Sequence, residues 1–149
     1  MLLKISLRAK KPSNPAYPTE LNTLGDYLRK TRLDRGLSQP EVARILNVTP
    51  DTVTGWELNR HEPPARLSKA IIAFLGFCPH EGKSPGKELK CARLITGKTQ
   101  REVAEMIGCD ASNLRYIELD KRKPQPKTLE KIQDFINSAL SSLSKASLE

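Results

Sequence analysis

The sequence predicts an all-α protein that contains two tandem copies of one helical unit, each with about five helices. The first observation is an internal repeat: residues 24–75 align without a gap on residues 85–136, and 14 of the 52 pairs are identical. Ordinary composition would supply roughly three identities over that length. The second observation is that polar residues suited to helix starts recur at the same places in both copies. Together they indicate a duplicated helical domain.

In the first copy, the helix boundaries are visible as capping residues. Thr23 opens a helix that Gly36 ends, because glycine tolerates the left-handed conformation at a helix end. The segment 38–41, Ser-Gln-Pro-Glu, is a capping box with proline in the first turn. Thr49 then caps a helix that begins with proline, and Pro63 separates this helix from a final amphipathic one.

The second copy repeats this order with different residues. Thr99 and Glu102 form its capping box, and Asp110 caps the following helix. Pro124 and Pro126 precede its last helix. The same succession of helices is therefore expected in both units.

Composition divides the chain into five parts. Residues 1–20 form a basic, proline-containing arm that we expect to be mostly unfolded. The two helical domains span 21–77 and 85–137, and the linker between them is 78–84, in a stretch rich in glycine and proline. Residues 138–149 are a Ser-rich C-terminal tail that we expect to fray.

The net charge of +8 favours a polyanionic partner, either nucleic acid or an anionic membrane surface. Aromatic residues make up only 5% of the chain, so an aromatic platform for single-stranded bases is not expected. No apolar run approaches the roughly 20 residues that span a bilayer. We therefore expect a cytoplasmic protein without a membrane partner.

The three cysteines, Cys78, Cys91 and Cys109, are odd in number and share no CxxC spacing. We therefore expect neither a disulfide framework nor a zinc site, and a reducing compartment. Cys78 and His80 resemble half of a metal site, but no second pair completes it. The sequence also has no catalytic triad pattern, no paired catalytic carboxylates and no phosphate-binding glycine loop. We expect no enzyme activity, no metal or cofactor, and no small-molecule substrate.

Two short helices joined by a tight turn, the second capped at its start, form the helix-turn-helix arrangement. Both copies resemble the lambda repressor–Cro type of helix-turn-helix, the XRE family of bacterial and phage regulators. The resemblance lies in 32–57, with Gly-Leu-Ser-Gln-Pro-Glu-Val-Ala at 36–43, and in 93–118, with Gly-Lys-Thr-Gln-Arg-Glu-Val-Ala at 97–104. It covers about two thirds of the chain. It implies two lambda-repressor-like DNA-binding domains.

The resemblance also implies roles for residues outside the recognition helix. Gln39 and Gln100 begin the second helix of each unit, where the family glutamine bonds a DNA phosphate and orients the recognition helix. The alternative is an ordinary polar residue of the first turn. Semi-buried salt bridges between the first and third helices are expected for two pairs, Arg32 with Glu57 and Arg93 with Glu118.

The N-terminal residues of each recognition helix face the major groove in this family. Asparagine can bond adenine there, and arginine can bond guanine. The candidates are Ser112, Asn113, Arg115 and Tyr116 in unit two, and Asp51, Thr52 and Thr54 in unit one. Pro50 and Gly55 of unit one offer no side-chain donor. Two interpretations stay open: both units recognise sequence, or unit one positions the protein and unit two specifies the site.

The loop after each recognition helix lies beside the phosphate backbone in the family. Arg60 is the candidate phosphate ligand in unit one, and Lys121, Arg122 and Lys123 are the candidates in unit two. A solvated basic loop is the alternative interpretation. The basic arm 1–20 is a candidate minor-groove contact.

The sequence therefore predicts a sequence-specific double-stranded DNA-binding transcriptional regulator, a repressor that uses both units on a bipartite operator. Two alternatives stay open. The chain could be the DNA-binding component of a recombinase or transposase system, or one unit could serve as a protein–protein contact module. A homodimer formed through the last helix, near Phe135 and Leu140, also stays open.

Overall fold

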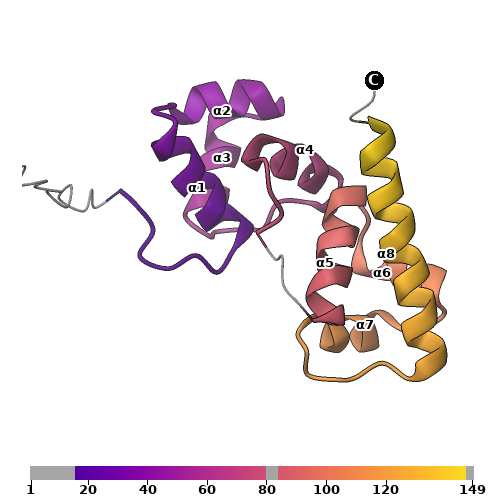
Figure 1. Cartoon of the computed structure of the whole chain (residues 1–149). Helices are drawn as coiled ribbons and strands as arrows, with labels where there is room; N and C mark the ends of the chain where they lie inside the picture. Colours follow the sequence, from indigo (N-terminus) through magenta and orange to yellow (C-terminus); the bar gives the residue numbers. More distant parts are fainter. Residues whose placement is uncertain (1–15, 80–83, 147–149) are drawn as a thin grey trace, which may run out of the picture.

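The computed structural model describes residues 16–79 and 84–146, and these residues form eight helices and no strands (Figure 1). The helices of unit one are α1 (Leu24–Asp34), α2 (Gln39–Leu46), α3 (Pro50–Glu57) and α4 (Ala65–Leu75). Those of unit two are α5 (Pro85–Thr96), α6 (Gln100–Ile107), α7 (Ala111–Glu118) and α8 (Pro126–Ala146). The all-α class with two tandem units is confirmed.

The expected number of about five helices per unit is wrong, because each unit has four within the described residues. The connection between the third and fourth helices is a tight turn followed by a short non-helical segment in both units. Its prolines, Pro63 and Pro64 in unit one, lack the amide hydrogen that a further helical turn would need. Every helix of unit two begins 61 residues after its counterpart, so the sequence repeat is also a structural repeat.

The helix caps lie where the sequence predicts them. Thr23, Ser38 and Thr99 each accept from the backbone amide three residues later in a complete capping box. Thr49 and Asp110 cap the starts of α3 and α7 in the same way, without the reciprocal bond. These bonds satisfy amides that would otherwise lack a partner at the start of a helix. The caps at Thr49 and Asp110 set where α3 and α7, the two helices that carry the candidate site, begin.

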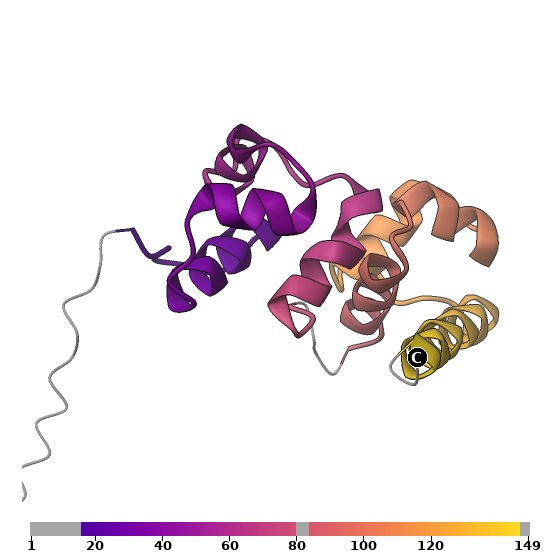
Figure 2. The same cartoon turned by 90° about the horizontal axis from the view of Figure 1, so that it is seen from above.

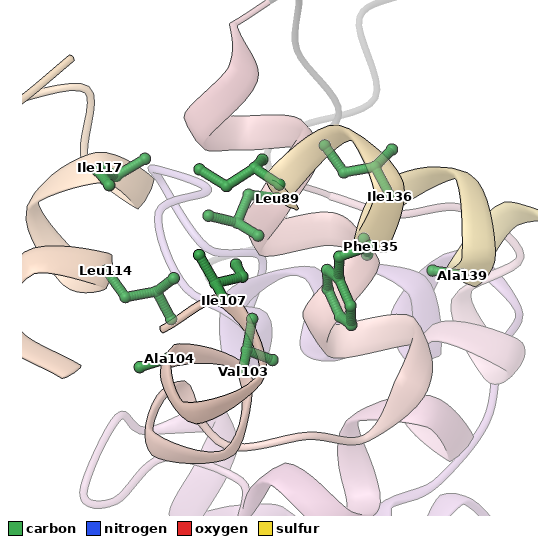
Figure 3. Close-up of a cluster of buried hydrophobic side chains, with 11 residues drawn as sticks. Leu89, Val103, Ala104, Ile107, Leu114, Ile117, Phe135, Ile136 and Ala139 are labelled. Atoms are coloured by element: carbon green, nitrogen blue, oxygen red, sulfur yellow. The ribbon is translucent and has the colours of Figure 1, made fainter. Parts of the chain in front are cut away.

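Each unit has its own hydrophobic core. In unit one the core surrounds Trp56, whose side chain is fully buried among residues of all four helices. In unit two, Leu89, Leu114, Ile117 and Ile132 are the central buried side chains. Figure 3 shows how side chains from α5, α6, α7 and α8 converge in this second core. Two separate cores mean that each recognition helix is held by its own unit.

The expectation of a frayed C-terminal tail beginning at residue 138 is wrong, because α8 continues to Ala146. Ala139 is 2% exposed and belongs to the second core, which stabilises the Ser-rich part of the helix. Phe135 is also buried in that core, so of the two residues suggested near a dimer contact only Leu140 is exposed. Residues 147–149 lie outside the described part of the chain, as do most of the basic arm and His80.

The two units meet where α4 packs against α5, which lie side by side in Figures 1 and 2. The Ser68 hydroxyl of α4 is 1% exposed and lies 2.8 Å from the carbonyl oxygen of Leu94 in α5, to which it donates. A methyl group added at Gly97 would lie 3.5 Å from the carbonyl oxygen of Ala65, so the end of α5 reaches the start of α4 closely. The junction is therefore a packed interface.

The structure also corrects the expectation about cysteines. Cys78 and Cys91 form a disulfide at this junction, with their Cα atoms 6.1 Å apart, and Cys109 is unpaired and partly exposed. Cys78 follows α4 and Cys91 lies on α5, so the pairing depends on how these helices dock. An odd number of cysteines in the sequence does not reveal that proximity. Cys78, assigned to the linker, is buried at the junction.

Candidate nucleic-acid interface

In each unit, the second and third helices are joined by a tight turn. The turn after α2 contains Asn47 in the left-handed conformation, with φ of 55°, and the turn after α6 contains Gly108, with φ of 83°. Each third helix then begins at a capping residue, Thr49 or Asp110. This places the N-terminal half of α3 and of α7 at the surface of its unit, while Val53 and Leu114 are fully buried beneath.

A buried ion pair fixes the third helix to the first in both units. The Arg32 Nε atom lies 2.6 Å from Glu57 Oε1, and a second guanidinium nitrogen lies 2.9 Å from Oε2. Arg93 and Glu118 repeat this two-pronged arrangement at 2.6 and 3.1 Å. The pairs expected from the family resemblance are thus present, and they set the orientation of α3 and α7.

The two glutamines are linked to these ion pairs. The amide nitrogens of Gln39 and Gln100 donate to Glu57 and Glu118, respectively, over 2.9 Å. The carbonyl oxygen of Gln39 also accepts from Thr54, whereas the residue in the position of Thr54 in unit two is Arg115. The Gln39 amide is therefore engaged at both ends, and no equivalent hydroxyl faces the oxygen of Gln100. The two units differ at this point.

In unit two the recognition helix and the loop after it form one ordered basic surface. Arg122 of the loop donates to Asn113 Oδ1 over 2.8 Å, and its guanidinium carbon lies 5.3 Å from the centre of the Tyr116 ring. Ser112 and Arg115 are exposed on the same helix. The flanking loop residues are also exposed: Lys121 and Lys123. All the candidate DNA-binding side chains of α7 and its loop are therefore exposed except that of Asn113, which holds Arg122 in place.

In unit one the corresponding polar side chains are bonded to one another. The hydroxyl of Thr52 lies 2.8 Å from that of the capping Thr49, and Thr54 donates to the carbonyl oxygen of Pro50 as well as to Gln39. Asp51 and Arg60 are exposed. The hydroxyl groups of Thr52 and Thr54 and the amide of Gln39 already have hydrogen-bond partners within the unit, so α3 presents fewer unengaged donors than α7 does.

The contact between the recognition helix and the loop after it is made by different residues in the two units. The imidazole of His61 lies directly over Gly55 and occupies the space that a side chain at position 55 would take. The equivalent positions in unit two hold Arg122 and Tyr116, which stack instead. The loop thus rests on its recognition helix in both units, through a small–large pair in unit one and a cation–π pair in unit two.

The sequence interpretation missed the residue that anchors each of these loops. Asn59 and Asp120 occupy equivalent positions and both have positive φ, 56° and 57°. Asn59 accepts from the Thr23 hydroxyl over 2.7 Å, and Asp120 accepts from the Ser84 hydroxyl over 2.8 Å. The available signal was an Asn and an Asp at matching positions after a helix, since these residues adopt the left-handed conformation more readily than most.

Asp26 completes the anchor in unit one. Its carboxylate accepts from the side chain of Asn59 and from the backbone amides of Asn22 and Thr23, at 2.9 to 3.0 Å. Burial alone would raise the pKa of Asp26, but these hydrogen bonds outweigh it and lower the pKa below its ordinary value. A lowered folded-state pKa means that the ionised carboxylate stabilises the fold above the unfolded-state pKa, which is about 3.9.

We therefore expect Asp26→Asn to destabilise unit one by about 1–3 kcal/mol at neutral pH, because a hydrogen-bonded buried charge is lost. The difference from wild type should shrink as the pH falls through the folded-state pKa of Asp26, where the wild-type carboxylate is itself protonated. Urea unfolding at neutral pH and in acid measures both effects. The exposed Asp134→Asn is the control, and an Asp26→Asn deficit that is constant with pH would contradict the assignment.

The geometry defines a protein with two helix-turn-helix units, each with a fixed recognition helix. Comparison with protein families agrees: the helix-turn-helix family model of the XRE, Cro/C1 type matches residues 28–82 and 90–143. The chain belongs to this helix-turn-helix family. Domains of this family are DNA-binding, typically non-enzymatic regulators. Comparison with curated proteins and with solved structures finds no match for the chain.

None of the described helices is long and apolar enough to cross a membrane. Within residues 16–79 and 84–146, no three His, Cys, Asp or Glu side chains gather in a way that could hold a metal ion.

Proposed function

We propose that the chain is a sequence-specific repressor of transcription that binds a bipartite operator in double-stranded DNA. Membership of the helix-turn-helix family implies DNA binding and transcriptional regulation. The observation that best supports sequence-specific binding is the ordered basic surface of unit two. There Arg122 is held by Asn113 and Tyr116, and Arg115 of the same helix as Tyr116 is exposed. Side chains held in place lose less conformational entropy when they bind DNA.

In this proposal the two units have different tasks. Arg115 is the main base-recognising residue, since its guanidinium can bond O6 and N7 of a guanine together. Ser112 and Tyr116 add contacts from the same face of α7. Lys121, Arg122 and Lys123 bind phosphates, which fix the register but carry no sequence information directly. Gln100 adds a phosphate contact from the start of α6.

Unit one contributes mainly to positioning. The hydrogen bonds of Thr52 with Thr49 and of Thr54 with Gln39 favour this division, because those groups would have to exchange partners to reach bases. Arg60 and Asp51 are its exposed candidates, the first for phosphate and the second as an acceptor for cytosine. The same observation favours a second candidate function for unit one, that of a protein–protein contact module.

Arg115 provides the test of sequence recognition. Selection of bound duplexes from a random pool should yield a site with a guanine that Arg115→Gln no longer prefers, at a cost of about 1–3 kcal/mol in discrimination at that base pair. Thr54→Gln, at the matching position of α3, is the comparison and should change discrimination much less. If Arg115→Gln selects the same site with the same stringency, α7 does not recognise sequence through this residue.

A further inference from the structure

A cleft of about 1010 Å³ lies between the two units. One wall is formed by the start of α1 and the loop after α3 in unit one, and the other by α5, the start of α6 and α7 in unit two. The packing of α4 on α5, with the buried Ser68–Leu94 hydrogen bond, holds the walls together. The cleft is thus a property of the docked pair, since neither unit alone has both walls.

Basic side chains dominate the charge of this cleft. Two carboxylates line it, Glu62 and Glu118, and Glu118 is already paired with Arg93. Besides Arg93, the cations that line it are Arg60, Lys90, Arg101 and Arg115. Arg101 has only a long, exposed contact of 3.5 Å with Glu105. The cleft therefore carries a surplus of positive charge.

Lys90 is the unusual member of this set. It is half-buried on α5, yet it forms none of the ion pairs found in the described part of the chain. Burial lowers its pKa, and the more distant carboxylates of Glu118 and Glu62 only partly oppose this. Withdrawing an ammonium group from water without a partner is unfavourable, so an anion brought into the cleft would be stabilised there.

The position of the cleft indicates which anion it takes. It is continuous with Gln100 and Arg115 on the recognition side of unit two, and with Arg60 in the loop after the recognition helix of unit one. A duplex bound to α7 would therefore bring a strand to the cleft, whereas a free small anion would gain contacts with only part of this extended wall. The loop after α3 is also held in place, through Asn59 and Asp26.

We propose that the cleft between the units binds the sugar–phosphate backbone of one DNA strand, with Lys90 and Arg60 as phosphate ligands from opposite walls. This inference rests on the proposed DNA-binding function and adds a site that depends on both units together. It also gives the fixed junction a role: the packing of α4 on α5 keeps the two phosphate ligands at a constant separation.

The test compares full-length variants on one duplex that carries the selected site. Lys90→Gln and Arg60→Gln each remove a cation from the cleft, and Lys87→Gln removes one from the exposed side of α5, outside the cleft. The affinity of each is measured as a function of potassium chloride concentration. Each phosphate contact contributes about 0.9 to the slope of log K against log salt. We expect each cleft variant to lose about that much slope, and Lys87→Gln to keep the wild-type slope.

The results distinguish a failure of the cleft proposal from a failure of the proposed DNA-binding function. If wild type binds with a steep slope and both cleft variants match Lys87→Gln, the cleft inference is overturned while the proposed function stands. If wild type itself shows a flat salt response, the proposed function fails. Titrating the DNA-free protein with inorganic phosphate at constant ionic strength distinguishes the source of the anion. We expect no saturable binding, whereas saturable phosphate binding that Lys90→Gln abolishes would identify a site for a free anion and overturn the proposal of a DNA strand. Arg60→Gln lies in an exposed loop, so the test does not depend on the folding of Lys90→Gln.

Discussion

Replacing Glu118 by glutamine is expected to destabilise unit two by about 3–5 kcal/mol, the usual cost of removing one partner from a buried ion pair. The side chains of Arg93 and Glu118 are only 10% and 2% exposed, so the remaining guanidinium would be left without a counter-charge and with little water. The amide of Gln100 would also lose a charged acceptor. Since small domains are stable by only about 5–15 kcal/mol, this is a large fraction of the total.

The same unit contains a matched control for this prediction. Arg101 and Glu105 form a contact on the surface of α6, with side chains 85% and 70% exposed. Glu105→Gln should change stability by less than about 1 kcal/mol, because exposed pairs are screened by water and contribute little. Denaturant unfolding of the three proteins measures the difference. Equal midpoints for Glu118→Gln and Glu105→Gln would contradict the structural role assigned to the buried pair.

Gly86→Ala is expected to be the second most damaging change, although alanine is the better helix former by about 0.8–1.0 kcal/mol. An added Cβ would overlap the carbonyl oxygen of Ile117 at the end of α7 and would lie 2.6 Å from Asp120 Oδ1. Relief requires α5 and α7 to separate, and overpacking of this kind typically costs about 1–3 kcal/mol. Because the contact is with backbone, we expect the upper part of that range.

Unit one provides an independent repeat of this experiment. Gly25 is the counterpart of Gly86, and its added Cβ would overlap the carbonyl oxygen of Trp56. Gly25→Ala should therefore destabilise unit one similarly, while Lys87→Ala, exposed one residue after Gly86, should stay within about 0.5 kcal/mol of wild type. Thermal unfolding reports all three. A Gly86→Ala variant as stable as wild type would show that α5 is not held this close to α7.

The starts of the helices could be predicted from the sequence because they depend on residues close together in the chain. A capping residue and the amide it accepts from are three residues apart, so Thr23, Ser38, Thr99 and Asp110 could be recognised without knowing the fold. The repeat then carried each assignment from one unit to the other. The sequence could also place the glutamines and the ion-pair residues, through the family resemblance.

Apart from the number of helices per unit, the errors concern contacts between segments distant in the chain. Serines near residue 140 weaken a helix locally, but the burial of Ala139 against the second core extends α8 regardless. Cys78 and Cys91 meet only because α4 docks on α5. Gly25 is identical to its counterpart in the repeat, but the sequence does not show why glycine is needed there. The structure does, because α1 approaches the end of α3 too closely for a side chain at this position.

The central claim is that the chain binds double-stranded DNA electrostatically through both units, and the salt dependence of binding tests it most directly. With about six phosphates contacted, log K for the selected duplex should fall with log salt at a slope of about −5. Five cations are proposed as phosphate ligands, namely Lys121, Arg122 and Lys123 in unit two and Lys90 and Arg60 in the cleft, and they account for most of this slope. A slope near zero would contradict DNA binding, and a slope of about −3 that Arg60→Gln leaves unchanged would restrict binding to unit two.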